Sequence, residues 1–172
     1  MTPEDPMREV DRLADLVERV VEGDPWHGPS VVSLLDGVAA RDAAAAVVSG
    51  AHSIWELVVH MTGWAREVSA RLGGAPAGEP HAGDWPAVDD AADAAWTAAV
   101  AALVDSHRAL ATAIRATGDR ALEAPVVDDR DAAAGAGLSR YLTLHGLVHH
   151  TTYHAGQIAV LKRAILTSPR LE

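Results

Sequence analysis

The stretch Leu144-His145-Gly146-Leu147-Val148-His149-His150-Thr151-Thr152-Tyr153-His154-Ala155-Gly156-Gln157-Ile158 decides how this chain folds and where its chemistry lies. It contains four of the nine histidines and the only glutamine of the 172-residue chain. Neutral histidine is the commonest metal ligand in proteins. Two pairs, His145/His149 and His150/His154, have the i,i+4 spacing that places both side chains on one face of a helix. The pair that faces the core decides which histidines can act together.

Helical phase separates these two pairs. The core face of this helix is defined by its apolar side chains, Leu147, Ile158, Leu161 and Ile165. They fall at roughly 160–220° from His145 when each residue turns the helix by about 100°. His150 and His154 fall at roughly 140° and 180°, within the core face, and His149 falls at roughly 40°. We therefore expect His150 and His154 to point inward and His145 and His149 to face away.

Four long segments carry apolar residues at helical spacing. We expect helices over residues 3–22, 53–72, 89–116 and 138–166. The first begins with a capping Thr2 followed by proline, and the second with the capping box that Ser53 and Glu56 can form. The third repeats its core positions at alternating spacings of four and three from Trp96 to Ile114, as in a coiled coil.

The segments between these helices are rich in turn-forming residues. Residues 73–88 contain four glycines and three prolines, and residues 118–137 are also expected to form a loop. Short helical turns are expected at residues 30–35 and 42–47. No segment alternates polar and apolar residues as a half-buried strand does. The sequence thus predicts an all-α protein, one domain over residues 1–172, built as a four-helix bundle with a long crossover connection.

Composition excludes several classes of function. The formal charge is −10 and Lys162 is the only lysine, so neither nucleic acid nor an anionic membrane surface is an expected partner. The absence of cysteine excludes thiol catalysis by the chain itself and cysteine-based metal sites. We find no signal peptide and no run of about 18 apolar residues that could span a bilayer. A cytoplasmic location fits these features.

The inward histidines favour a metal site but do not prove one. His150 and His154 could ligate a divalent ion, or they could be core histidines that bond to neighbouring side chains. The protease signature H-E-x-x-H is absent. A third ligand would have to come from another helix, where His60 is favoured because Glu56, one turn earlier, could orient its other ring nitrogen. His107 is the second choice for this role.

Two blocks of sequence resemble a known family. The block from His52 to Trp64, H-S-I-W-E-L-V-V-H-M-T-G-W, and the block from His150 to Ile158, H-T-T-Y-H-A-G-Q-I, are similar to those of the DinB-like metal-binding four-helix-bundle superfamily (DinB/YfiT-like). The turn over residues 26–30 and the loop over 84–86 look alike as well. The resemblance implies that His60, His150 and His154 ligate a divalent metal, typically zinc or nickel, completed by water. It also implies a homodimer, since many members form dimers.

Better-understood members of that superfamily are thiol-dependent transferases and isomerases. They use a low-molecular-weight thiol such as bacillithiol, mycothiol or glutathione, which would let a chain without cysteine carry out thiol chemistry on a small-molecule substrate. The enzyme would be a metal-dependent thiol S-transferase or a hydrolase. The alternative is a non-catalytic, metal-stabilised helical bundle that acts as a binding or stress-response module. A bundle without metal is a third reading.

Four further side chains are candidates for contacting a substrate: His27, Trp64, Tyr153 and Gln157. Trp26 and Trp85 could help to wall the pocket. One residue departs from the family pattern, because Thr151 stands where Asp or Asn often follows the first histidine of the motif. If that side chain supports the metal ligands, metal affinity could differ in this protein.

Overall fold

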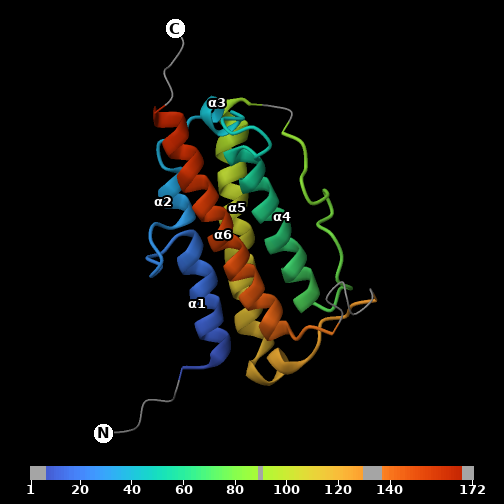
Figure 1. Cartoon of the computed structure of the whole chain (residues 1–172). Helices are drawn as coiled ribbons and strands as arrows, with labels where there is room; N and C mark the ends of the chain where they lie inside the picture. The colour runs from blue at the N-terminus through green and yellow to red at the C-terminus, as the bar shows by residue number, and fades with distance from the viewer. Residues whose placement is uncertain (1–6, 89–90, 130–136, 168–172) are drawn as a thin grey trace, which may run out of the picture.

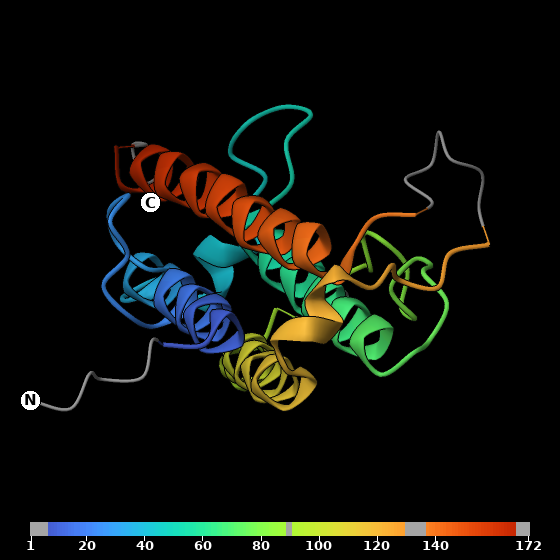
Figure 2. The same ribbon diagram turned by 90° about the horizontal axis from the view of Figure 1, so that it is seen from below.

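Four long helices form the body of the protein. The computed structural model describes residues 7–88, 91–129 and 137–167. The long helices are α1 (Glu9–Val21), α4 (Ile54–Leu72), α5 (Asp93–Thr117) and α6 (Arg140–Thr167). They lie side by side in Figure 1, and Figure 2 shows them from below. Because α1 and α4 each pack against both α5 and α6, the four helices form a bundle in which α5 and α6 lie on a diagonal. This confirms the predicted all-α four-helix bundle.

Shorter elements complete the fold. They are α2 (Val31–Leu35), α3 (Ala40–Ala43) and the 3₁₀ helix η1 (Asp119–Glu123). The side chain of Ser30 caps α2 as expected. The predicted turn at 42–47 is shifted to 40–43, and the predicted loop at 118–137 contains η1. In the described part of the chain, extended pairing is limited to one isolated bridge between Pro125 and Ser139.

The start of α1 differs from the prediction. Thr2, the predicted cap of this helix, lies outside the described residues, and the helix begins at Glu9. No local side chain caps it; instead the carboxylate of Asp119 accepts hydrogen bonds from the backbone N–H groups of Glu9 at 3.1 Å and Val10 at 3.0 Å. A cap that comes from more than a hundred residues away leaves no local signal in the sequence. The predicted start of α5 at residues 89–90 also lies outside the described residues, and the helix runs from Asp93.

The start of α4 is fixed by the predicted capping box. The backbone N–H of Glu56 donates to Oγ of Ser53 at 3.2 Å, and the backbone N–H of Ser53 donates to Oε2 of Glu56 at 2.7 Å. Two of the otherwise unpaired donors of the first turn are satisfied in this way. The box fixes where α4 begins, and His60 follows on its buried face.

Two apolar clusters make up the core. One includes Leu103 of α5 and Ala155 of α6, and the other includes Leu110 of α5 and Leu147 of α6. Buried polar side chains lie between these positions: His107 on α5, and Thr151 and His154 on α6. The bundle therefore has a polar layer at mid-height. Among the described residues, no helix is long and apolar enough to cross a membrane.

Candidate metal centre

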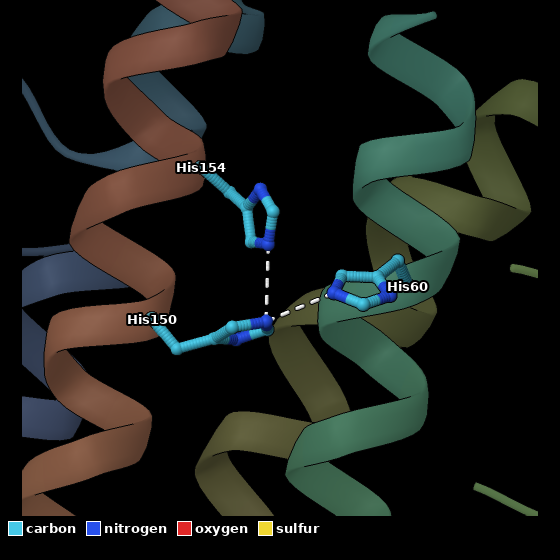
Figure 3. Close-up of side chains that lie close together, drawn as sticks. All are labelled: His60, His150 and His154. Atoms are coloured by element: carbon cyan, nitrogen blue, oxygen red, sulfur yellow. Dashed lines mark hydrogen bonds between the residues drawn. The ribbon is translucent and has the colours of Figure 1, made fainter. Parts of the chain in front are cut away.

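Three histidines from two helices point toward one another in this polar layer (Figure 3). His60 comes from α4, and His150 and His154 come from successive turns of α6. Nε2 of His150 lies 2.8 Å from Nε2 of His60 and 3.0 Å from Nε2 of His154. Each side chain offers one ligand atom, and these atoms all lie within 4.8 Å of one another. The structure thus brings together the three residues that the sequence singled out, and they could hold a metal ion.

Hydrogen bonds on the far side of two rings fix which nitrogen carries the proton. Nδ1 of His60 lies 2.7 Å from the backbone carbonyl oxygen of Asp84, and Nδ1 of His154 lies 2.6 Å from the side-chain oxygen of Gln157. A carbonyl oxygen can only accept, so each Nδ1 is the donor. In the neutral ring the proton is then on Nδ1, and Nε2 presents a lone pair. His60 and His154 therefore both turn a lone pair toward His150.

His150 completes the set as a neutral ring. Burial, together with the charges that His154 and His60 would carry, lowers the pKa of His150 to about 4. The pKa of His154 is also lowered, chiefly by burial and against the effect of its bond to Gln157. Neutral imidazole is the form that binds metals. Nδ1 of His150 is buried without a hydrogen-bond partner, so this nitrogen can carry the single proton and leave Nε2 as a third lone pair.

The spacing of the nitrogens fits a transition metal. Imidazole nitrogens bind zinc at about 2.0–2.1 Å, so two of them on one tetrahedral ion lie about 3.3 Å apart. The two short separations at His150 are 2.8 Å and 3.0 Å. To hold an ion, His150 would move a few tenths of an ångström from its two neighbours and the set, whose ligand atoms lie within 4.8 Å of one another, would close around it. Three nitrogen ligands leave a fourth position, as in catalytic rather than structural zinc sites.

The connection between α4 and α5 supports His60 in a way that the sequence analysis missed. The carboxylate of Asp84 accepts a hydrogen bond from Nε1 of Trp64 at 2.7 Å and lies 3.3 Å from Nδ1 of His60. Trp85 stacks flat on the His60 ring, with centroids 3.8 Å apart and planes 5° apart. The expectation that Glu56 would orient His60 is wrong, because its carboxylate serves the capping box. Asp84 takes that position instead.

A cavity of about 420 Å³ opens beside the cluster. Its wall includes His60 and His150 at one end and Trp64 and Arg71 on α4. This volume lies in the range of small-molecule sites. The structure thus places Trp64, one of the four substrate candidates, in the wall of a cavity that reaches two of the three histidines.

The other substrate candidates lie elsewhere. Tyr153 and Gln157 line a second cavity of about 560 Å³, and the Tyr153 side chain is 65 % exposed. Gln157 also holds His154, as described above. His27 lines a third cavity of about 570 Å³ near the start of α2, apart from the three histidines. Trp26 is fully exposed beside it, so the expectation that Trp26 would wall the site is wrong.

His145, His149 and Thr151 lie outside the cluster. His149 is exposed as expected, but His145 is half-buried, with its ring 4.5 Å from that of Tyr141 and its Nε2 buried. Both rings thus lie away from the cluster as expected, and only the partial burial of His145 was not anticipated. The hydroxyl of Thr151 donates to the carbonyl oxygen of Leu147 at 3.0 Å. It is therefore turned to its own helix rather than to the histidine rings.

The second-choice ligand, His107, does not join the cluster. It is buried on α5, with its Nδ1 donating to the carbonyl oxygen of Leu103 at 2.9 Å and its Nε2 buried without a partner. Burial lowers the pKa of His107. It is a neutral core histidine in the same polar layer.

Comparisons with known proteins give one match. A family model described as the DinB superfamily matches residues 26–158. The matched region includes His60, His150, His154 and the supporting loop around Asp84. No curated protein and no solved structure matches the chain.

Proposed function

The chain belongs to the DinB superfamily, and we propose that it is a metal-dependent enzyme. The proposed reaction is the transfer of a low-molecular-weight thiol to a small-molecule substrate, or the thiol-dependent isomerisation of that substrate. Zinc or nickel is the proposed ion, held by His60, His150 and His154. The observation that carries the proposal is the convergence of three imidazoles beside a cavity of about 420 Å³. A purely structural site would not need an adjoining cavity.

The residues around the cluster have distinct roles in this proposal. His60, His150 and His154 would hold the ion, and Asp84 and Gln157 would keep two of these rings in the tautomer that presents Nε2. A divalent ion at this place would act as a Lewis acid and lower the pKa of a bound thiol or water. Trp64 and Trp85 shield the cluster from bulk water. The thiol must come from a cosubstrate because the chain has no cysteine.

The alternative is a non-catalytic bundle in which the ion serves stability alone. The experiment that separates the two begins with protein purified without chelators, whose metal content is measured by mass spectrometry. The same preparation is then assayed for transfer of bacillithiol, mycothiol and glutathione to electrophiles. Near-stoichiometric metal with thiol-dependent turnover, lost in His154→Ala, supports the enzyme. Near-stoichiometric metal without turnover favours the alternative.

We also propose that the protein forms a homodimer through the outer face of α6. Tyr153 and Val160, two turns apart on this face, are 65 % and 64 % exposed, and Gly156 lies between them. Large apolar side chains in a row on one helix are typical of a contact surface. Val160→Glu is expected to yield a monomer in sedimentation analysis, whereas Val127→Glu, at another exposed apolar position, is expected to leave the dimer intact. A wild-type monomer would contradict the proposal.

A further inference from the structure

The cavity beside the histidine cluster has chemically different ends. On α4 its wall includes His60 and Arg71, which are eleven residues apart and lie on the same face of the helix. The rise of an α-helix separates their backbone positions by about 16 Å. The Arg71 side chain points toward His60, because its Nε donates to Glu67, which lies one helical turn closer to His60. The distance from the guanidinium to His60 is therefore shorter than the distance between their backbones. One end of the cavity thus presents imidazole nitrogens and the other a guanidinium.

The guanidinium of Arg71 is held in place by the protein. Nε donates to Oε1 of Glu67 at 3.0 Å, and Nη2 donates to the carbonyl oxygen of Gly78 at 2.8 Å. Its central carbon lies 5.6 Å from the centre of the Trp64 ring. Arg71 is only 8 % exposed, yet it forms part of the cavity wall. A guanidinium carries five N–H donors in fixed directions. These contacts use the Nε hydrogen and one Nη2 hydrogen, so three donors remain.

The rest of the wall is mainly apolar. Leu142 and Leu147 of α6 face Val68 of α4 across the cavity. The acid in the wall, Asp84, lies at the histidine end, where its carboxylate accepts from Trp64. A negative group on a ligand would be repelled at that end. At the other end Glu67 pairs with Arg71 at 3.0 Å and offsets part of its charge, so a negative group there would be held chiefly by the N–H donors that Arg71 still has free. The wall therefore orients a ligand as well as enclosing it.

We propose that this cavity binds a small apolar molecule that carries one carboxylate, with the carboxylate on Arg71 and the apolar body between α4 and α6. The opposite end of the molecule then faces the nitrogens of His60 and His150. A planar guanidinium fork matches the geometry of a carboxylate. Arg71, which already pairs with Glu67, does not balance a more highly charged anion such as a phosphate ester. This molecule would be the electrophilic substrate of the function proposed above, on which this assignment rests.

Binding of a carboxylate and of its neutral analogue tests this assignment. The probes are 4-phenylbutyrate and 4-phenylbutanamide, titrated calorimetrically into the protein as purified. Loss of a charge-assisted hydrogen bond costs about 1.5–3 kcal/mol, so the carboxylate is expected to bind at least about tenfold more tightly than the amide. Arg71→Gln is expected to remove this preference. Arg66→Gln, an exposed position on the same helix, is expected to keep it.

A second variant closes the cavity from the other helix. A Cβ placed on Gly146 would meet no atom within 4 Å, and this residue lines the cavity. Gly146→Leu therefore fits the backbone, favours the helix, and fills the space that the apolar body would occupy. It is expected to abolish binding of both probes while unfolding remains cooperative. This variant keeps the test decisive if Arg71→Gln fails to fold.

Several outcomes would overturn the assignment. They are equal affinity for the two probes, equal weakening by Arg66→Gln and Arg71→Gln, or unchanged binding in Gly146→Leu. The titrations need no thiol and no turnover. Carboxylate binding without thiol transfer would thus contradict the proposed reaction but not the pocket, and thiol transfer without any preference for carboxylates would contradict the pocket alone.

Discussion

Gln157 accepts a hydrogen bond from Nδ1 of His154 at 2.6 Å, about one turn along α6. The bond fixes the ring in the tautomer whose Nε2 faces His150. Partners of this kind typically change metal affinity by about 10–100-fold. We predict that Gln157→Leu weakens zinc binding by about that factor, whereas Gln157→Glu, which keeps an acceptor, retains it. Competition against a chromophoric chelator measures both, and equal affinities for Gln157→Leu and wild type would contradict the role of this bond.

Removing single histidines separates the inward and outward pairs of α6. We predict that His150→Ala loses most of its metal because a ligand is gone, and that His149→Ala keeps it because that ring is exposed. Metal content of unstripped protein, measured by mass spectrometry, checks both. A comparable loss in His149→Ala would mean that the cluster is not the metal site.

The cap of α1 offers a test of stability. The carboxylate of Asp119 accepts from two backbone N–H groups at the start of α1. We predict that Asp119→Ala lowers the free energy of unfolding by about 0.5–2 kcal/mol, the usual effect of removing a cap. Urea denaturation measures the change. Asp24→Ala, at an exposed loop position, serves as the control, and equal effects of the two substitutions would contradict a capping role.

Buried His107 makes the stability of the protein depend on pH. Burial lowers its pKa in the folded state, so between that value and the unfolded pKa of about 6.5 only the unfolded chain binds the proton. Stability is then full above about pH 6.5 and falls as the pH drops below it. We predict that His107→Leu flattens the decline of melting temperature between about pH 6.5 and pH 5, measured with metal removed. An unchanged slope would show that His107 contributes nothing to it.

Local signals in the sequence predicted most of the fold. The capping box of Ser53 and Glu56 and the phase of His150 and His154 both depend on spacings of three or four residues, which a helix converts directly into geometry. These features were found as expected. The start of α1 was not, because Asp119 caps it from a distant part of the chain.

The residues that hold the three histidines in place were harder to predict than the histidines themselves. A loop has no periodicity, so the sequence offered Trp85 only as a residue that could wall the pocket, and it did not indicate that Asp84 would reach His60 or that Trp85 would stack on that ring. Glu56 was chosen for that role by spacing alone, but the backbone at the start of α4 competes for the same carboxylate. Helical phase gave the direction of His145 but not its partial burial beside Tyr141.

The stacking of Trp85 on His60 gives the protein an optical signal of its own. An indole that lies flat on a ligand ring, with centroids 3.8 Å apart, is close enough to a bound ion for its fluorescence to respond. A paramagnetic ion such as nickel would quench this emission, whereas zinc, with a filled d shell, would not do so by that route. Metal binding can thus be followed by the fluorescence of the unlabelled protein, and nickel can be distinguished from zinc.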